Sequence, residues 1–127
     1  MLHVVASDTP SKLALLNLGY VARVHKLVWF VPEVAVEATR DAVFAAGAGR
    51  IGRYERCSWY TAGTGTFLAG EGADPAIGEV GREERVSEWR VETVVPADRV
   101  EAVVQALRAA HPYEEPAFEL YAIGDVQ

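Results

Sequence analysis

The sequence predicts one α+β domain in which two β-α-β units share an antiparallel sheet and place their helices on the same face. Two observations predict this fold. The segment ending in Val31-Pro32 recurs as the segment ending in Val95-Pro96, at an offset of 64 residues, and the match continues into the following helical pattern. Each copy reads as a strand of β-branched and aromatic residues, then proline, then roughly fourteen residues with helical periodicity.

Length, composition and charge limit the number of domains and the kinds of partner that this chain is expected to have. The 127 residues fit a single domain, and half of them are hydrophobic, which is enough for a real core. A net charge of −6 disfavours nucleic acid as a partner. The single cysteine, Cys57, is read as a small buried hydrophobe in a strand and fits a reducing compartment, so a cytoplasmic location is expected. The early apolar stretch 13–22 is shorter than the roughly 20 residues that cross a bilayer, and no membrane partner is expected.

The chain divides at the start of the repeat. Residues 1–25 are read as an N-terminal extension with a short helix starting at Pro10, and residues 26–127 as the single domain. In the first strand, alternate residues point to opposite sides and both sides are apolar. One side will pack under the helices, while the other, centred on Phe30, favours self-association.

Proline marks the start of each helix, and a stop signal marks its end. The first helix follows Pro32 and closes at Gly47, and the second follows Pro96 and closes at His111. The second helix carries a clear apolar stripe at Val100, Val103, Val104, Leu107 and Ala110. The first has Thr39 and Arg40 at two equivalent positions, so its packing is predicted to use smaller contacts. Two such units on one antiparallel sheet form a ferredoxin-like sandwich.

Glycines dominate the region between the repeats. Residues 47–52 match a G-x-G-x-x-G pattern, but a helix precedes it and a strand is expected from about Ile51, so the pattern is read as a helix cap and turn rather than a dinucleotide site. Residues 63–81 hold six of the eleven glycines and are read as a long loop that can contact a ligand. Arg50 and Arg53 near the turn suggest an anion site, with solvated strand charges as the alternative.

The stretch His111-Pro112-Tyr113-Glu114-Glu115-Pro116 is the most distinctive in the chain. It brings an imidazole and carboxylates close together, which suggests a metal, but Pro112 ends the helix, so His111 and Glu114 do not share a helical face. The alternative is a stiff structural turn into the last strand. No nucleophile motif is present, and no catalytic residue is predicted. The ligand-binding candidates are Arg50, Arg53, Gly65, Glu71, His111 and Tyr113, and the metal candidates are His111 and Glu114.

Five stretches of the sequence, 45–54, 57–58, 63–67, 77–81 and 111–117, together resemble the inserted domain of the Nif-three-like family. Members of that family are often labelled GTP cyclohydrolase one type two homologues. The resemblance runs over roughly residues 26–123 in family order. It implies a fold similar to the CutA divalent-cation tolerance proteins and the PII signalling proteins, which are ferredoxin-like trimers. Full-length members resemble a two-lobed enzyme with two metal ions, and the lobes have no counterpart in this sequence, so a stand-alone copy of the insert is expected.

The expected function is therefore a non-catalytic module that senses a small ligand or drives assembly, as a homotrimer, with a small molecule or a protein as partner. The loop 63–81 and the turn at His111 are its expected contact regions. The alternative is a metal-dependent hydrolase of the GTP cyclohydrolase kind, or a CutA-like divalent-cation binder. In that case His111 and Glu114 from neighbouring chains would complete a site, and a divalent metal would be its cofactor.

Overall fold

The computed structural model describes residues 23–75 and 77–124, so the expected N-terminal helix lies outside the described residues. Within them the chain forms four strands, two α-helices and two 3-10 turns. In chain order these are β1 (Val24–Val31), η1 (Glu33–Ala35), α2 (Val36–Ala45), β2 (Ser58–Leu68), β3 (Glu83–Pro96), η2 (Ala97–Arg99), α3 (Val100–Ala110) and β4 (Phe118–Ile123).

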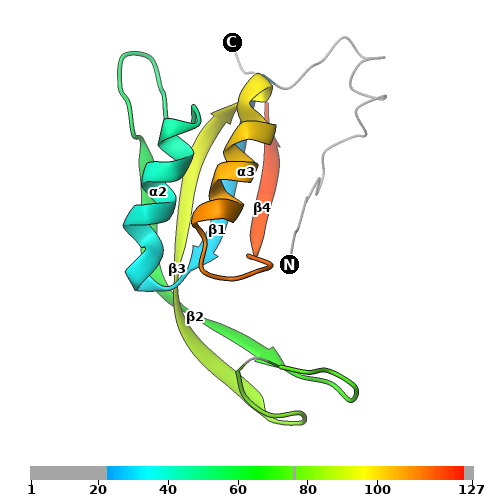
Figure 1. Cartoon of the computed structure of the whole chain (residues 1–127). Coiled ribbons are helices and arrows are strands. Elements are labelled where there is room, and N and C mark those ends of the chain that lie inside the picture. Colours follow the sequence, from blue (N-terminus) through cyan, green and yellow to red (C-terminus); the bar gives the residue numbers. More distant parts are fainter. Residues whose placement is uncertain (1–22, 76, 125–127) are drawn as a thin grey trace, which may run out of the picture.

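The strands form an antiparallel sheet in the order β2-β3-β1-β4, with α2 and α3 side by side on one face (Figure 1). This confirms the predicted ferredoxin-like class. The duplication is also visible in the backbone. Pro32 and Pro96 both have φ −60° and extended ψ, and each leads through a 3-10 turn into an α-helix. No helix in the described part of the chain is long and apolar enough to span a membrane.

The core lies between the sheet and the helices. Alternate residues of β1 point into it, as predicted, and so do alternate residues of β3. Two members of the α3 stripe, Val103 and Leu107, are completely buried, while Val100 and Val104 pack at its margin. The main buried side chains are Leu27, Trp29, Val31, Val43, Val91, Val95, Val103, Leu107 and Phe118.

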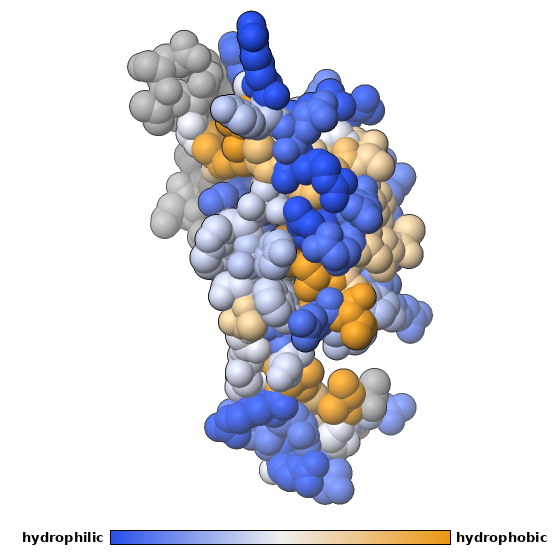
Figure 2. Space-filling view, turned by 90° about the vertical axis from the view of Figure 1, so that its left-hand side faces the viewer, coloured by the Kyte–Doolittle hydropathy of each residue, from blue (hydrophilic) through white to orange (hydrophobic). Residues whose placement is uncertain are grey.

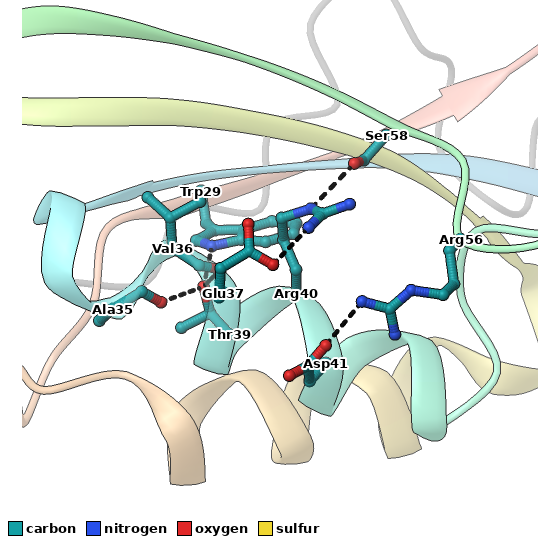
Figure 3. A network of polar contacts seen from close by, with 9 residues as sticks. All are labelled: Trp29, Ala35, Val36, Glu37, Thr39, Arg40, Asp41, Arg56 and Ser58. Atoms are coloured by element: carbon teal, nitrogen blue, oxygen red, sulfur yellow. Dashed lines mark hydrogen bonds and ion pairs between the residues drawn. The ribbon is translucent and has the colours of Figure 1, made fainter.

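Thr39 packs at the helix position where the sequence predicted only a small contact. Its hydroxyl is completely buried and accepts a hydrogen bond of 3.0 Å from the indole N–H of Trp29 (Figure 3). The same hydroxyl lies 2.8 Å from the carbonyl oxygen of Ala35, to which it donates. The threonine thus satisfies the one polar atom of the largest core side chain, because a buried indole N–H without a partner is costly.

Replacing Thr39 with valine is expected to lower the free energy of unfolding by about 1–3 kcal/mol, because the shape is kept while the Trp29 N–H loses its partner. Thr39→Ser keeps the hydroxyl and should cost less than Thr39→Val. Urea denaturation followed by circular dichroism measures both. A smaller loss for Thr39→Val than for Thr39→Ser would show that methyl packing, and not the hydrogen bond, is what Thr39 supplies.

The predicted loop at residues 63–81 is wrong in its first part. Residues 63–68 continue β2 and pair with β3, from Gly63 opposite Glu88 to Leu68 opposite Glu83. Glycine weakens a strand but does not prevent backbone pairing, and the partner strand holds it in place. The paired segments 63–68 and 83–88, with the connection 69–82, project beyond the helices (Figure 1), and we call them the arm.

The predicted strand start near Ile51 is also wrong. Ile51 and Tyr54 form only an isolated bridge within the connection 46–57, and β2 starts at Ser58. Gly47, with φ +118°, follows the end of α2, as the helix-cap interpretation predicted. Cys57 precedes the strand instead of lying in it. It is half-buried, and its carbonyl oxygen accepts a hydrogen bond of 2.7 Å from the Thr93 hydroxyl.

Candidate ligand pocket

A pocket of about 480 Å³ lies between the arm and the turn 111–117 that leads into β4. It brings together the segment 63–81 and the turn at His111, the two regions that the sequence predicts to contact a ligand. In Figure 2 apolar side chains show on the arm next to the body of the molecule, whereas the end of the arm is hydrophilic. The side chains and backbone that define the pocket include Gly65, Phe67, Ile77, Val86, Glu88 and Tyr113.

Strand alternation places the arm residues on one wall of this pocket. Gly65 and Phe67 are two apart on β2, and Val86 and Glu88 are two apart on β3, so each pair shares a face of its strand. Gly65 lies opposite Val86. A Cβ atom at Gly65 would lie 2.7 Å from Cδ of Glu88, so the glycine leaves room for that carboxylate.

Glu88 differs from the other glutamates of β3. Glu83, Glu84 and Glu92 each form an ion pair with an arginine or lysine. Within the described residues, no hydrogen bond or ion pair holds the carboxylate of Glu88, and burial raises its pKa above the ordinary glutamate value. The carboxylate at the pocket wall is thus left partly desolvated and without a counter-charge.

His111 ties the turn to the sheet. Its Nε2–H donates to the carbonyl oxygen of Phe30 over 2.7 Å, and its Nδ1 accepts from the backbone N–H of Tyr113 over 3.1 Å. These two partners assign the neutral tautomer with the proton on Nε2. The ring is buried and lies 5.0 Å from the Tyr113 ring, centroid to centroid. His111 therefore positions Tyr113, which forms part of the pocket wall.

Stability is expected to fall as the pH drops below about 7.5. Burial lowers the pKa of His111 in the folded chain, although its hydrogen bond to Phe30 opposes the shift, and burial also lowers the pKa of His25. The unfolded chain, with an ordinary histidine pKa near 6.5, therefore binds protons first as the pH falls. The free energy of unfolding should be flat above about pH 7.5 and decline by at most about 1.4 kcal/mol per pH unit for each histidine below that value.

His111→Gln tests which histidine carries this dependence. The glutamine amide can donate to the Phe30 carbonyl but does not titrate in this range. Urea denaturation between about pH 5.5 and 8 should therefore give a shallower slope for the variant than for the wild type. An unchanged slope would assign the effect elsewhere and contradict the role given to His111.

The metal candidates do not converge within one chain. No group of three His, Cys, Asp or Glu side chains suited to a metal ion occurs among residues 23–75 and 77–124. Both ring nitrogens of His111 are engaged, and Glu114 is exposed. A metal ion bound to His111 would have to displace one of its two hydrogen bonds.

The arginine candidates lie elsewhere. Arg50 lines a smaller pocket of about 230 Å³ with Asp41, Phe44 and Arg56, in the connection between α2 and β2. This connection is at the opposite end of the sandwich from the turn 111–117 (Figure 1). At this end of the sandwich, the guanidinium of Arg56 forms an ion pair with the carboxylate of Asp41 at 2.6 Å (Figure 3). Arg53 and Glu71 are exposed and line neither of these two pockets.

Of the candidates predicted from the sequence, Gly65 and Tyr113 line this pocket between the arm and the turn 111–117. Phe67, Val86 and Glu88 also line it and were not among the candidates. A signal for the missed residues was present. Apolar and charged residues alternate through 83–88, and a strand there would have placed Val86 and Glu88 on one face. The glycine content of 63–72 concealed the partner strand.

Comparison with known proteins agrees with the motif resemblance. No family model matches the chain. Over 102 residues it is 59% identical to the GTP cyclohydrolase 1 type 2 homologue of Mycobacterium tuberculosis. That alignment covers 80% of this chain but only 27% of the relative, so the chain spans about a quarter of the curated relative's length.

Solved structures give the same result for the fold. A Bacillus cereus protein related to NIF3 superposes with a TM-score of 0.72 and 42% identity, over 84% of this chain and 27% of its own. CutA from Synechococcus elongatus superposes with a TM-score of 0.60 and 21% identity, over 82% and 80% of the two chains. GlnK from Bacillus subtilis superposes with a TM-score of 0.58 and 12% identity, over 80% and 85%. The chain is thus homologous to one segment of the Nif3-like GTP cyclohydrolase 1 type 2 homologues, and it has the CutA-like and PII-like fold.

Proposed function

We propose that this chain is a non-catalytic, self-associating module that binds a small ligand in the pocket between the arm and the turn 111–117. The observation that carries the proposal is the pocket itself. Its volume of about 480 Å³ falls within the range of roughly 300–1,000 Å³ that small-molecule sites occupy, and its walls are mainly apolar with a few polar groups. Ligand binding there would couple the arm to the body, because the two supply different walls.

The sheet face opposite the helices is the proposed assembly surface. Trp59 is 60% exposed on it, and Phe30 is half-buried, with the guanidinium of Arg90 5.8 Å from its ring centroid. Lys26 and Arg90 both pair with Glu92, at 3.1 and 3.2 Å. The apolar patch expected around Phe30 is therefore a mixed surface, in which an aromatic group can supply contact area and the ion pairs can fix the register. A homotrimer is the assembly we propose.

Native mass spectrometry of untreated protein tests both halves of this proposal. We expect a trimer that carries the mass of a small organic molecule. Trp59→Lys should shift the mass towards monomer, because a charge would be buried in the interface. Tyr54→Lys, which changes another exposed aromatic outside the sheet, is the matched control and should leave the trimer intact. A wild-type monomer without bound ligand would contradict the proposal.

The same experiment addresses the metal-dependent alternative, a hydrolase or divalent-cation binder with a site shared between subunits. That alternative requires His111 and Glu114 from different chains to meet. It predicts a stoichiometric metal ion in the spectrum that is lost in His111→Ala and in Glu114→Gln. Our proposal predicts that neither substitution removes a metal mass.

A further inference from the structure

We propose that the pocket between the arm and the turn 111–117 binds a small organic cation, a protonated amine carried on an apolar or aromatic body. The inference rests on the proposed function, since it names the ligand class for the same pocket. It follows from the charge and the aromatic character of the pocket wall.

Among the residues that the structure describes, the charged side chains of the wall are all negative. Its described residues include Glu88 and Asp74 and no lysine, arginine or histidine. A ligand with a phosphate or carboxylate would enter this pocket against two carboxylates and would find no cation to pair with. A protonated amine has the complementary charge, and its ammonium group supplies three hydrogen-bond donors to acceptors that lack partners.

Glu88 is the expected contact for that ammonium group. Every other glutamate of β3 has a cationic side chain within 3.6 Å, whereas Glu88 has none among the described residues. A partly desolvated carboxylate without a partner is unfavourable, and a bound cation would remove that cost. Gly65 keeps the space beside this carboxylate open, since any larger residue would push it aside.

The rest of the wall suits the apolar body of such a ligand. Phe67 and Tyr113 present aromatic rings, and Ile77 and Val86 present aliphatic side chains. Phe67, Ile77 and Tyr113 are 38–48% exposed in the absence of a ligand, so covering them with an apolar group is favourable. Aromatic faces also attract an ammonium group placed over them.

Isothermal titration calorimetry with three ligands of one shape tests the proposal. The probes are 2-phenylethylammonium, the neutral 2-phenylethanol and the anionic phenylacetate. We expect the ammonium to bind about tenfold or more tightly than the alcohol, and phenylacetate to bind more weakly than either.

Two variants connect that preference to Glu88. Glu88→Gln keeps the shape and should reduce ammonium affinity about tenfold, to near that of the alcohol. Gly65→Ala keeps the charge but displaces the carboxylate, and it should weaken ammonium binding as well. Glu101→Gln, on an exposed position of α3, makes the same change in net charge and should alter no affinity. Circular dichroism spectra and melting curves establish that each variant is folded.

Several results would overturn the inference. They are equal binding of the three probes, tighter binding of phenylacetate, no binding of any probe, or an ammonium affinity that Glu88→Gln leaves unchanged. Binding only to the monomeric Trp59→Lys variant would show that a second copy of the chain occupies the pocket. Binding of neutral or anionic probes in the pocket would refute the cation preference while leaving the proposed function intact. Failure of the proposed function appears separately, as a monomer without retained ligand in native mass spectrometry.

Discussion

Replacing Trp29 with alanine is expected to lower the free energy of unfolding by about 3–5 kcal/mol. Trp29 is completely buried at the centre of the sheet, where its register partners are Val91 on β3 and Phe118 on β4. Removing the indole leaves a large cavity between the sheet and α2, and it takes away the hydrogen bond to Thr39. Because small domains have about 5–15 kcal/mol of stability in total, the variant should be close to unfolding. Urea denaturation followed by circular dichroism measures the loss.

Two controls separate the cavity from the lost hydrogen bond. Trp29→Phe removes the N–H but keeps an aromatic ring in the core. It should therefore lower the free energy of unfolding by less than Trp29→Ala does. Its effect should be less than additive with Thr39→Val, because both remove the same hydrogen bond. Tyr54→Ala removes an aromatic side chain that is 75% exposed and should change stability by less than about 0.5 kcal/mol. Similar losses for Trp29→Ala and Tyr54→Ala would contradict the assigned core.

Gly49→Ala is expected to lower the free energy of unfolding by about 2–5 kcal/mol, because two separate effects add. Gly49 has φ +85°, which side-chain-bearing residues rarely adopt. A Cβ atom there would also lie 2.6 Å from the Phe44 ring, and overpacking a buried ring is itself destabilising. The backbone of Gly49 cannot easily shift to relieve the clash. Its N–H donates to Val94 over 2.8 Å, and its carbonyl accepts from Cys57 over 2.8 Å.

Gly52 provides the matched control within the same connection. It also has positive φ, +58°, but nothing lies within 4 Å of the position of its Cβ. Gly52→Ala should therefore show only the backbone cost, about 1 kcal/mol. Thermal denaturation of both variants gives the comparison. If the two substitutions cost the same, the close approach of Gly49 to Phe44 does not exist in solution.

Local patterns predicted the sandwich because the features that define it are local. The apolar stripe of α3 follows from a spacing of three and four residues, and two of its members, Val103 and Leu107, are fully buried. Pro32 and Pro96 begin their helical segments in the same backbone conformation, as the repeat predicts. A repeat that reproduces a strand, a proline and a helix leaves few ways to arrange the two halves on one sheet.

Long-range pairing accounts for what the sequence did not predict. The glycines at 63 and 65 look like loop residues, and only their register with β3 makes them part of a strand. The same is true of the buried hydrogen bond between Trp29 and Thr39, whose partners come from different elements. Neither is visible in a window of neighbouring residues.

In the candidate site, too, local sequence patterns predict some features and long-range contacts determine the others. His111 and Tyr113 are candidates because their stretch of sequence is distinctive, yet the position of the His111 ring depends on the carbonyl of Phe30, 81 residues earlier in the chain. Glu88 looks like one charge in an alternating run. What distinguishes it is that, in the part of the chain that the structure describes, it lacks the cationic partner that its neighbours have. Chemical identity can be read from the sequence, whereas the pairing of charges depends on the fold.

A fragment screen by solution NMR, using cationic, neutral and anionic fragments in equal numbers, tests whether small ligands bind between the arm and the turn 111–117. We expect the amide signals most often shifted by binding fragments to belong to the arm and the turn 111–117, including Gly65, Val86 and Tyr113. Fragment contacts concentrated at the connection 46–57, or spread evenly over the surface, would contradict the assignment of the ligand site to this pocket.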